Sequence, residues 1–320
     1  MRVVGIDFLR GVAAFGIVGC HLSLDQRTDG GHLVTALCDF NVGLFAVVAG
    51  FLMCGGYDKG RLAYVGKRAR RLLPIYFAWS AVFILVTAAF DLLLDGGCLN
   101  PRYETTSFWW RVIFLGGSAT HLWFLICLFY AQVILQGAFR ICANKWHGVL
   151  WIALGGVAAF ASAMSPSWFN RYPLRLTGFL MTGYGIGCIL QGGILEVCKR
   201  FNGVIWCVAV VVLVAHVIAG RSVHGFVKDW FAVGPVLLAF VGWEIKSGRL
   251  LRVVTILGAT SMGVYLVHPL VTRGLSVVVT RAVQPPYMAW VVLDEWLLAW
   301  TLSFAAALAL RRVPMVRRVV

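Results

Sequence analysis

Hydrophobic residues occur in long runs along this chain, and short polar segments separate the runs. A helix needs about 20 apolar residues to cross the hydrocarbon core of a bilayer, and ten runs reach or approach that length. They cover residues 5–24, 38–56, 72–94, 120–139, 148–164, 174–191, 203–219, 229–244, 254–280 and 290–310. The pattern therefore predicts an all-α protein, a polytopic transmembrane helical bundle of about ten spans.

The overall composition supports this class of protein. Hydrophobic residues make up 60% of the chain, charged residues only 13%, and the mean hydropathy is +0.84. Soluble domains are far less apolar. Ten spans of about 20 residues use about 200 residues, so the remainder suffices for loops but not for a separate globular domain. We expect residues 1–320 to form a single integral membrane domain.

Positive charges indicate how the bundle is oriented. If the N-terminus is cytoplasmic, 18 of the 28 lysines and arginines fall on the cytoplasmic side, mainly in segments 59–71, 140–145, 199–200, 246–252 and 311–318. Cytoplasmic loops carry this excess in membrane proteins. An even number of spans then places both termini in the cytoplasm, and we expect a multi-pass protein of the cytoplasmic (inner) membrane. Insertion bias and anionic lipid account for the net charge of +15 without a nucleic-acid partner.

Motifs for metals and tightly bound cofactors do not stand out in the sequence. The nine cysteines form no C-x-x-C pair and no metal-type spacing, and the chain shows no phosphate-binding loop, dinucleotide fingerprint or serine-hydrolase elbow. We therefore predict neither a metal site nor a tightly bound cofactor. The first apolar run contains Asp7, Arg10 and His21, and such polar residues are not typical of a cleaved signal peptide. We therefore expect this run to remain in the protein as a transmembrane span.

Two ionisable residues within the first run, Arg10 and His21, give the first indication of function. They are eleven positions apart, and at 100° per residue the rotation is about 1100°, so a helix places both side chains on one face. Along the axis they are roughly 16 Å apart, about half a hydrocarbon core. Such groups usually face a cavity or pathway. The pair predicts a site that runs through the membrane, although Asp7 could simply pair with Arg10 as an i,i+3 neighbour.

A basic run precedes the third apolar run and contains Lys67, Arg68, Arg70 and Arg71. One interpretation is a positive-inside anchor. The other is a phosphate clamp, because guanidinium groups bind phosphate bidentately and Arg68 and Arg71 share one side of a helix. The sequence leaves both interpretations open.

Two further histidines are candidates for the site. His121 opens the fourth run beside Trp123, and by itself it fits an interfacial residue. His268 lies near the middle of the ninth run, directly before Pro269. It could be part of a catalytic centre, or it could satisfy the carbonyl of Tyr265 that the proline leaves without an N–H donor.

Five segments together resemble the acyltransferase 3 family, and they occur in the order found in that family. They are Arg10-x10-His21, Gly50-Phe51-Leu52, Lys67-Arg68-x-x-Arg71-Leu-Leu-Pro74-x-Tyr76, His121-Leu-Trp123-Phe-Leu125 and Ser261-x-Gly263-x-Tyr265-Leu-x-His268-Pro269. Members are multispan enzymes that O-acylate extracytoplasmic sugars. Many have Ser-Gly-Phe in the second span where this chain has Ala49, so a role for a hydroxyl group there does not carry over.

The resemblance implies a reaction and a set of site residues. The donor would be cytoplasmic acyl-CoA, most simply acetyl-CoA, and the acceptor a hydroxyl group of a cell-surface sugar or polysaccharide. The implied catalytic residues are His21, Arg10, His121 and His268, and the implied substrate-binding residues are Arg68, Arg70, Arg71, Lys67, Tyr265, Ser261 and Trp123. A histidine, with a usual pKa of about 6.5, can take a proton from a sugar hydroxyl. Direct transfer and an acyl-enzyme on Ser261 or His21 both remain open.

A secondary transporter or a lipid-linked sugar flippase is the alternative, because buried His and Arg side chains also mark transport pathways. The chain shows no clear inverted repeat, and no pair of Gly- or Pro-broken spans occurs at matching positions. We therefore favour the enzyme. The sequence does not name the sugar, its hydroxyl position or the acyl chain.

Overall fold

A computed structural model of the chain describes most of its residues. The described residues are 3–22, 31–54, 61–94, 105–114, 121–138, 147–165, 168–219, 225–243, 245, 247–282 and 289–313. Within these ranges every regular element is a helix, which confirms the predicted all-α class. Some of the cations that predicted the orientation lie outside the described residues. They are those in segments 140–145 and 317–318 and at positions 2, 59 and 246.

Each of the ten predicted spans overlaps one long helix. These helices are α1 (Val4–Cys20), α3 (Gly31–Cys54), α4 (Arg61–Leu94), α6 (Trp123–Ala138), α7 (His147–Met164), α8 (Trp168–Ile189), α10 (Asn202–Ile218), α11 (Gly225–Val241), α12 (Gly248–Ala282) and α13 (Ala289–Leu310). A short helix, α5 (Thr106–Phe114), lies between α4 and α6, and a π-helix, η3 (Leu190–Ile194), and α9 (Leu195–Arg200) follow α8.

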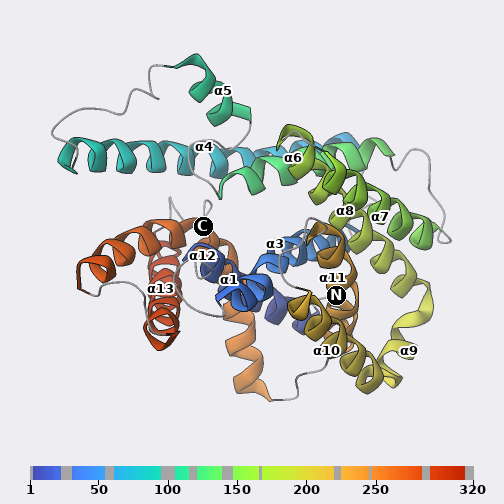
Figure 1. Ribbon diagram of the computed structural model, residues 1–320. Coiled ribbons are helices and arrows are strands. Elements are labelled where there is room, and N and C mark those ends of the chain that lie inside the picture. The colour runs from blue at the N-terminus through green and yellow to red at the C-terminus, as the bar shows by residue number, and fades with distance from the viewer. Residues whose placement is uncertain are drawn as a thin grey trace.

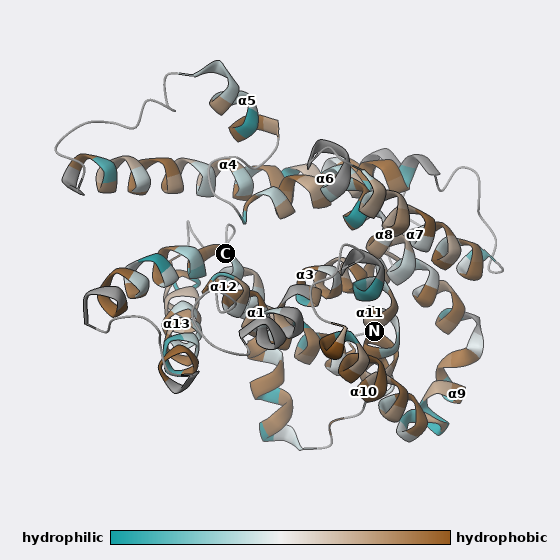
Figure 2. Ribbon diagram, viewed as in Figure 1, coloured by the Kyte–Doolittle hydropathy of each residue, from teal (hydrophilic) through white to brown (hydrophobic). Residues whose placement is uncertain are grey.

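Several of these helices have membrane length and composition. Among the described residues, four helical segments are long and apolar enough to cross a bilayer: Val65–Leu92, His147–Met164, Gly248–Val279 and Val291–Leu310. In Figure 2, apolar residues predominate on the long helices, and α10 is apolar over most of its surface. Apolar side chains such as Val211 and Ile218 of α10 point outward, as expected for a surface that faces lipid. The chain is an integral membrane protein, and the number of ten spans remains a prediction.

Close packing between α1 and α12 positions the central residues. A Cβ atom at Gly258 of α12 would lie only 2.6 Å from the Cα atom of Asp7, so a glycine is required for this approach of the two helices. Further along both helices, the rings of His21 and His268 meet again. The two helices therefore run in the same direction, as the first and ninth of ten alternating spans should.

The helices form neighbouring groups around α1. Figure 1 shows α4, α5 and α6 along one edge, α1, α12 and α13 together, and α3, α7, α8, α10 and α11 in the remaining part. The helix α5, which the sequence analysis did not predict, packs beside α4 and α6. The hydroxyl group of Tyr76 donates to the carbonyl of Val112, and that of Tyr130 donates to the carbonyl of Phe114 over 3.2 Å.

Candidate functional site

Three histidines from distant parts of the chain form the centre of the candidate site. The ring centroids are 4.8 Å apart for His21 and His268, 5.6 Å apart for His121 and His268, and 6.3 Å apart for His21 and His121. His21 is the C-cap residue of α1, His121 lies two residues before α6, and His268 lies within α12. The structure thus brings together all three histidines that the sequence analysis selected.

His21 is the most accessible of the three histidines. It is the C-cap residue of α1, where its backbone N–H donates to the carbonyl of Val18 over 3.2 Å. Its side chain is partly exposed, whereas His121 is 2% exposed and His268 is fully buried. A molecule that reaches the cluster from outside the bundle therefore meets His21 first.

The backbone of α12 determines which ring nitrogen of His268 is available. Its Nδ1 atom lies 3.2 Å from the carbonyl oxygen of Val264. A carbonyl can only accept, so Nδ1 carries the hydrogen, and in the neutral ring Nε2 keeps its lone pair. Among the described residues, none meets hydrogen-bonding geometry with Nε2. The ring of His268 thus contacts the backbone of α12 just before Pro269, at Val264 and also at Tyr265, as considered from the sequence. The lone pair of Nε2 can still accept a proton.

His121 is a buried residue of the cluster, so its side chain faces neighbouring helices, while its depth in the membrane remains a prediction. The ring of Phe83 from α4 packs against it edge-on at 4.7 Å, and the ring of Tyr265 lies 5.6 Å away. The hydroxyl group of Tyr265 donates to the backbone carbonyl of His121. Neither ring nitrogen of His121 meets hydrogen-bonding geometry with a described residue. The rings of His121 and His268 therefore lie side by side within the bundle, 5.6 Å apart between centroids.

Aromatic side chains enclose the inner side of the cluster. Phe124 packs against Tyr265 at 5.5 Å, and Phe45 of α3 packs against both of these rings, at 6.3 Å and 6.5 Å. Tyr265 is thus fixed by its hydrogen bond and by two rings. An apolar wall of this kind limits access of bulk water to the buried histidines and strengthens electrostatic interactions among them.

Arg10 lies on the same helix as His21 but away from the histidine cluster. Its NH1 atom is 3.9 Å from Oδ1 of Asp7, which confirms the i,i+3 ion pair considered from the sequence. The side chain of Arg10 is 25% exposed and that of Asp7 is 12% exposed. Arg10 is eleven positions from His21, which corresponds to about 16 Å along the axis.

The basic run lies on α4, the helix that also contacts His121. The segment is helical, so Arg68 and Arg71 lie on one side of it, as predicted. Lys67, Arg70 and Arg71 are exposed, and Arg68 is half-buried. Arg71 is twelve positions, about 18 Å of helix, from Phe83, which packs on His121. The structure therefore does not place the basic run beside the histidines.

Two other predicted substrate-binding residues also lie away from the cluster. The hydroxyl group of Ser261 donates to the carbonyl of Gly258 over 2.8 Å, and Gly258 packs on Asp7. Ser261 is seven positions, about 10 Å along α12, from His268. The ring of Trp123 packs against Tyr172 of α8 at 4.6 Å. Tyr265 is thus the predicted substrate-binding residue that contacts the histidines directly.

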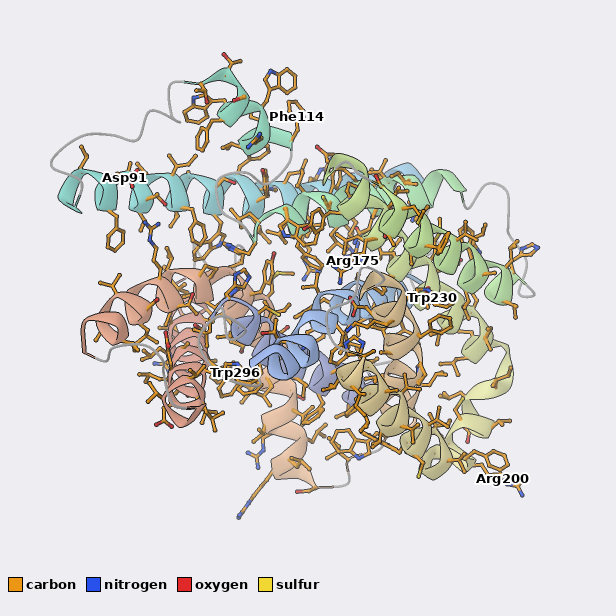
Figure 3. The ribbon with its side chains drawn as sticks, viewed as in Figure 1. Asp91, Phe114, Arg175, Arg200, Trp230 and Trp296 are labelled. Atoms are coloured by element: carbon orange, nitrogen blue, oxygen red, sulfur yellow. The ribbon has the colours of Figure 1, made fainter. Side chains whose placement is uncertain are left out.

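A second buried cluster of charged residues was missed in the sequence analysis. Arg175 of α8 and Asp229 of α11 form an ion pair, and His216 of α10 adjoins it; Arg175 is labelled in Figure 3. The sequence analysis selected none of these three residues as part of a site. The signal was present, because Arg175 and Asp229 both fall within predicted spans, where charges are costly.

Within the described part of the chain, no group of three or more His, Cys, Asp or Glu side chains is arranged to hold a metal ion. Donor groups suited to an anionic substrate are present in Arg10, Arg68 and Arg71. Together these features define a helical integral membrane protein with a buried histidine centre and separate cationic sites.

Comparison with known proteins identifies the family. The acyltransferase domain of the acyltransferase 3 family matches residues 3–312. The chain therefore belongs to this family, as its motifs had suggested, and is a membrane acyltransferase. No curated protein and no solved structure gives a significant match to the chain.

Proposed function

We propose that the protein moves an acyl group, most simply acetyl, from cytoplasmic acyl-CoA to a hydroxyl group of a cell-surface sugar or polysaccharide. The observation that carries this proposal is the convergence of His21, His121 and His268 in a chain that belongs to an acyltransferase family. The protein resides in the cytoplasmic membrane with both termini inside. The acceptor then approaches from the side where α1 ends.

His21 acts as the general base in this proposal. Its partly exposed ring removes the proton from the acceptor hydroxyl group, whose oxygen attacks the thioester carbon. The new C–O bond forms, the C–S bond breaks, and the proton passes to the departing CoA sulfur. His268 supports this step. Its ring is 4.8 Å from that of His21 between centroids, and its Nε2 atom carries a lone pair. The second imidazole can share the positive charge that develops on the first.

Direct transfer from donor to acceptor fits the described contacts better than an intermediate on Ser261. The Ser261 hydroxyl group already donates to Gly258, and it is two helical turns from the nearest histidine of the cluster. No base among the three histidines is positioned to activate it. We therefore assign Ser261 to the packing of α12 and not to the acyl transfer.

Arg10 of α1 binds the phosphates of the donor on the cytoplasmic side. The basic run of α4, with Arg68, Arg71 and their neighbours Lys67 and Arg70, contributes from a second helix. Guanidinium groups suit phosphate because two parallel N–H donors match two oxygens. The distance of about 16 Å from Arg10 to His21 along α1 is comparable to an extended pantetheine arm. A thioester held by its nucleotide end near Arg10 could thus reach the histidine cluster.

A transfer assay in detergent tests this function against the alternative of a transporter or flippase. Purified protein is given labelled acetyl-CoA and a soluble oligosaccharide, without any membrane gradient. The proposal predicts labelled ester and free CoA in equal amounts, because thioester-to-ester transfer is favourable and needs no ion coupling. A transporter releases no CoA. Absence of CoA release with several acyl chains and glycans would favour transport.

A further inference from the structure

The buried cluster of Arg175, Asp229 and His216 is not used in the proposed acyl transfer. The NH2 atom of Arg175 lies 2.6 Å from Oδ2 of Asp229, and Nε2 of His216 lies 3.6 Å from Oδ1 of the same carboxylate. All three side chains are at least nine-tenths buried. One carboxylate thus joins three different helices, α8, α10 and α11.

Stability alone does not account for such a cluster. Replacement of a buried ion pair by apolar residues of similar size is often neutral or stabilising, and charges within a membrane are costly. The advantage of an ion pair is its defined geometry, because a planar guanidinium group and a carboxylate fix the relative rotation of the helices that carry them. A helix held in this way can position a residue that it contacts.

The start of α8 links this cluster to the histidine centre. Tyr172 lies one turn before Arg175 on α8, and its ring packs against Trp123 at 4.6 Å. Trp123 is the first residue of α6, two positions after His121. A second link runs through α3, where the ring of Phe40 packs on His216 at 5.8 Å.

We propose that Arg175 and Asp229 are positioning residues for His121. Their ion pair fixes the start of α8, which presents Tyr172 to Trp123 and so holds the first turn of α6 at the cluster. This inference rests on the proposed function, since it assigns His121 to the reaction centre. A displacement of about 1 Å in a reacting group can cost about 100-fold in rate, so a loosened α8 should reduce turnover.

Paired apolar substitution separates positioning from stability. The variant Arg175→Met/Asp229→Leu removes both charges together, so neither partner is left buried alone. We expect normal expression and a Tm close to wild type, a KM for acetyl-CoA within about twofold, and a kcat reduced at least about tenfold. The matched control is Glu196→Ala/Lys199→Ala, which removes the exposed ion pair of α9 and should leave every parameter unchanged.

A second test follows the physical link. Trp123→Ala combined with the paired apolar variant should lower kcat by less than the product of the separate effects, because both changes act on the same contact. The milder variant Arg175→Lys, which keeps the charge but loses the planar fork, should reduce kcat without loss of folded protein.

Three results would overturn the inference. The first is a wild-type kcat in the paired apolar variant. The second is independent, multiplicative effects of Trp123→Ala and the paired variant. The third combines two observations: the paired variant does not fold, and the Arg175→Lys protein has the full wild-type kcat. A wild-type protein that transfers no acyl group contradicts the proposed function itself, and that outcome is recognised in the same assay before any variant is compared.

Discussion

His21 and His268 lie near opposite ends of the chain, yet their rings are 4.8 Å apart between centroids and tilted by 53°. Parallel packing of α1 on α12 brings them together, and Gly258 permits that packing beside Asp7. The Nδ1 atom of His268 is committed to its own helix. The pair therefore combines an accessible imidazole with a buried one of defined tautomer.

His268 should tolerate replacement only by a side chain that preserves the contact with Val264 and the lone pair. His268→Phe keeps the ring volume but loses both, and we expect transfer to fall by about 10²-fold or more. His268→Asn should fold as well as the wild type but remain inactive. Its amide can donate a hydrogen bond to the backbone, but it offers no base. Initial rates of CoA release, with melting temperature as the measure of folding, check this. Activity near wild type in His268→Phe would assign the residue to packing.

Arg10 should affect binding of the donor more than the chemical step. Arg10→Lys keeps the positive charge and the insertion signal but loses the bidentate fork, so the KM for acetyl-CoA should rise while kcat changes little. CoA should raise the Tm of the wild type, and it should raise the Tm of Arg10→Lys by a smaller amount. High salt should reduce both shifts by screening the charges. An unchanged KM together with an unchanged thermal shift would leave Arg10 as the partner of Asp7 alone.

Ser261 should be dispensable for acyl transfer. Its hydroxyl group donates a hydrogen bond to the carbonyl of Gly258. The residue lies about 10 Å along α12 from His268. Ser261→Ala is therefore expected to retain most activity, with at most a modest loss of stability from the missing hydrogen bond, about 1 kcal/mol. Mass spectrometry of protein quenched during turnover should find no acyl group on Ser261. An acylated Ser261, or an inactive but folded Ser261→Ala protein, would support an acyl-enzyme.

Much of the fold could be predicted from the sequence because the strongest signal, long apolar runs, is local. Each run overlaps one long helix, and the ion pair of Asp7 with Arg10 follows from helical spacing alone. The small helix α5 was missed because it has only nine residues and is held by tyrosines of α4 and α6. Short helices depend on such tertiary contacts.

The candidate site was predicted less completely than the fold. The three histidines could be selected by motif, but their mutual contact depends on how α1, α6 and α12 pack, which no local pattern specifies. The burial of His121 depends likewise on Phe83 of α4. The ion pair of Arg175 and Asp229 joins residues 54 positions apart, so only the presence of charges in apolar runs pointed to it.

His21 is the most direct test of the histidine centre. His21→Ala and His21→Gln are compared with wild-type protein in the detergent assay with labelled acetyl-CoA and a soluble oligosaccharide, at matched amounts of folded protein. His147, which begins α7 and has no assigned role, provides the control His147→Gln. Loss of a general base should lower ester formation by about 10²–10⁴-fold in both His21 variants, with insertion and the CoA-induced shift of Tm retained. Near-normal ester formation by either His21 variant would contradict the account.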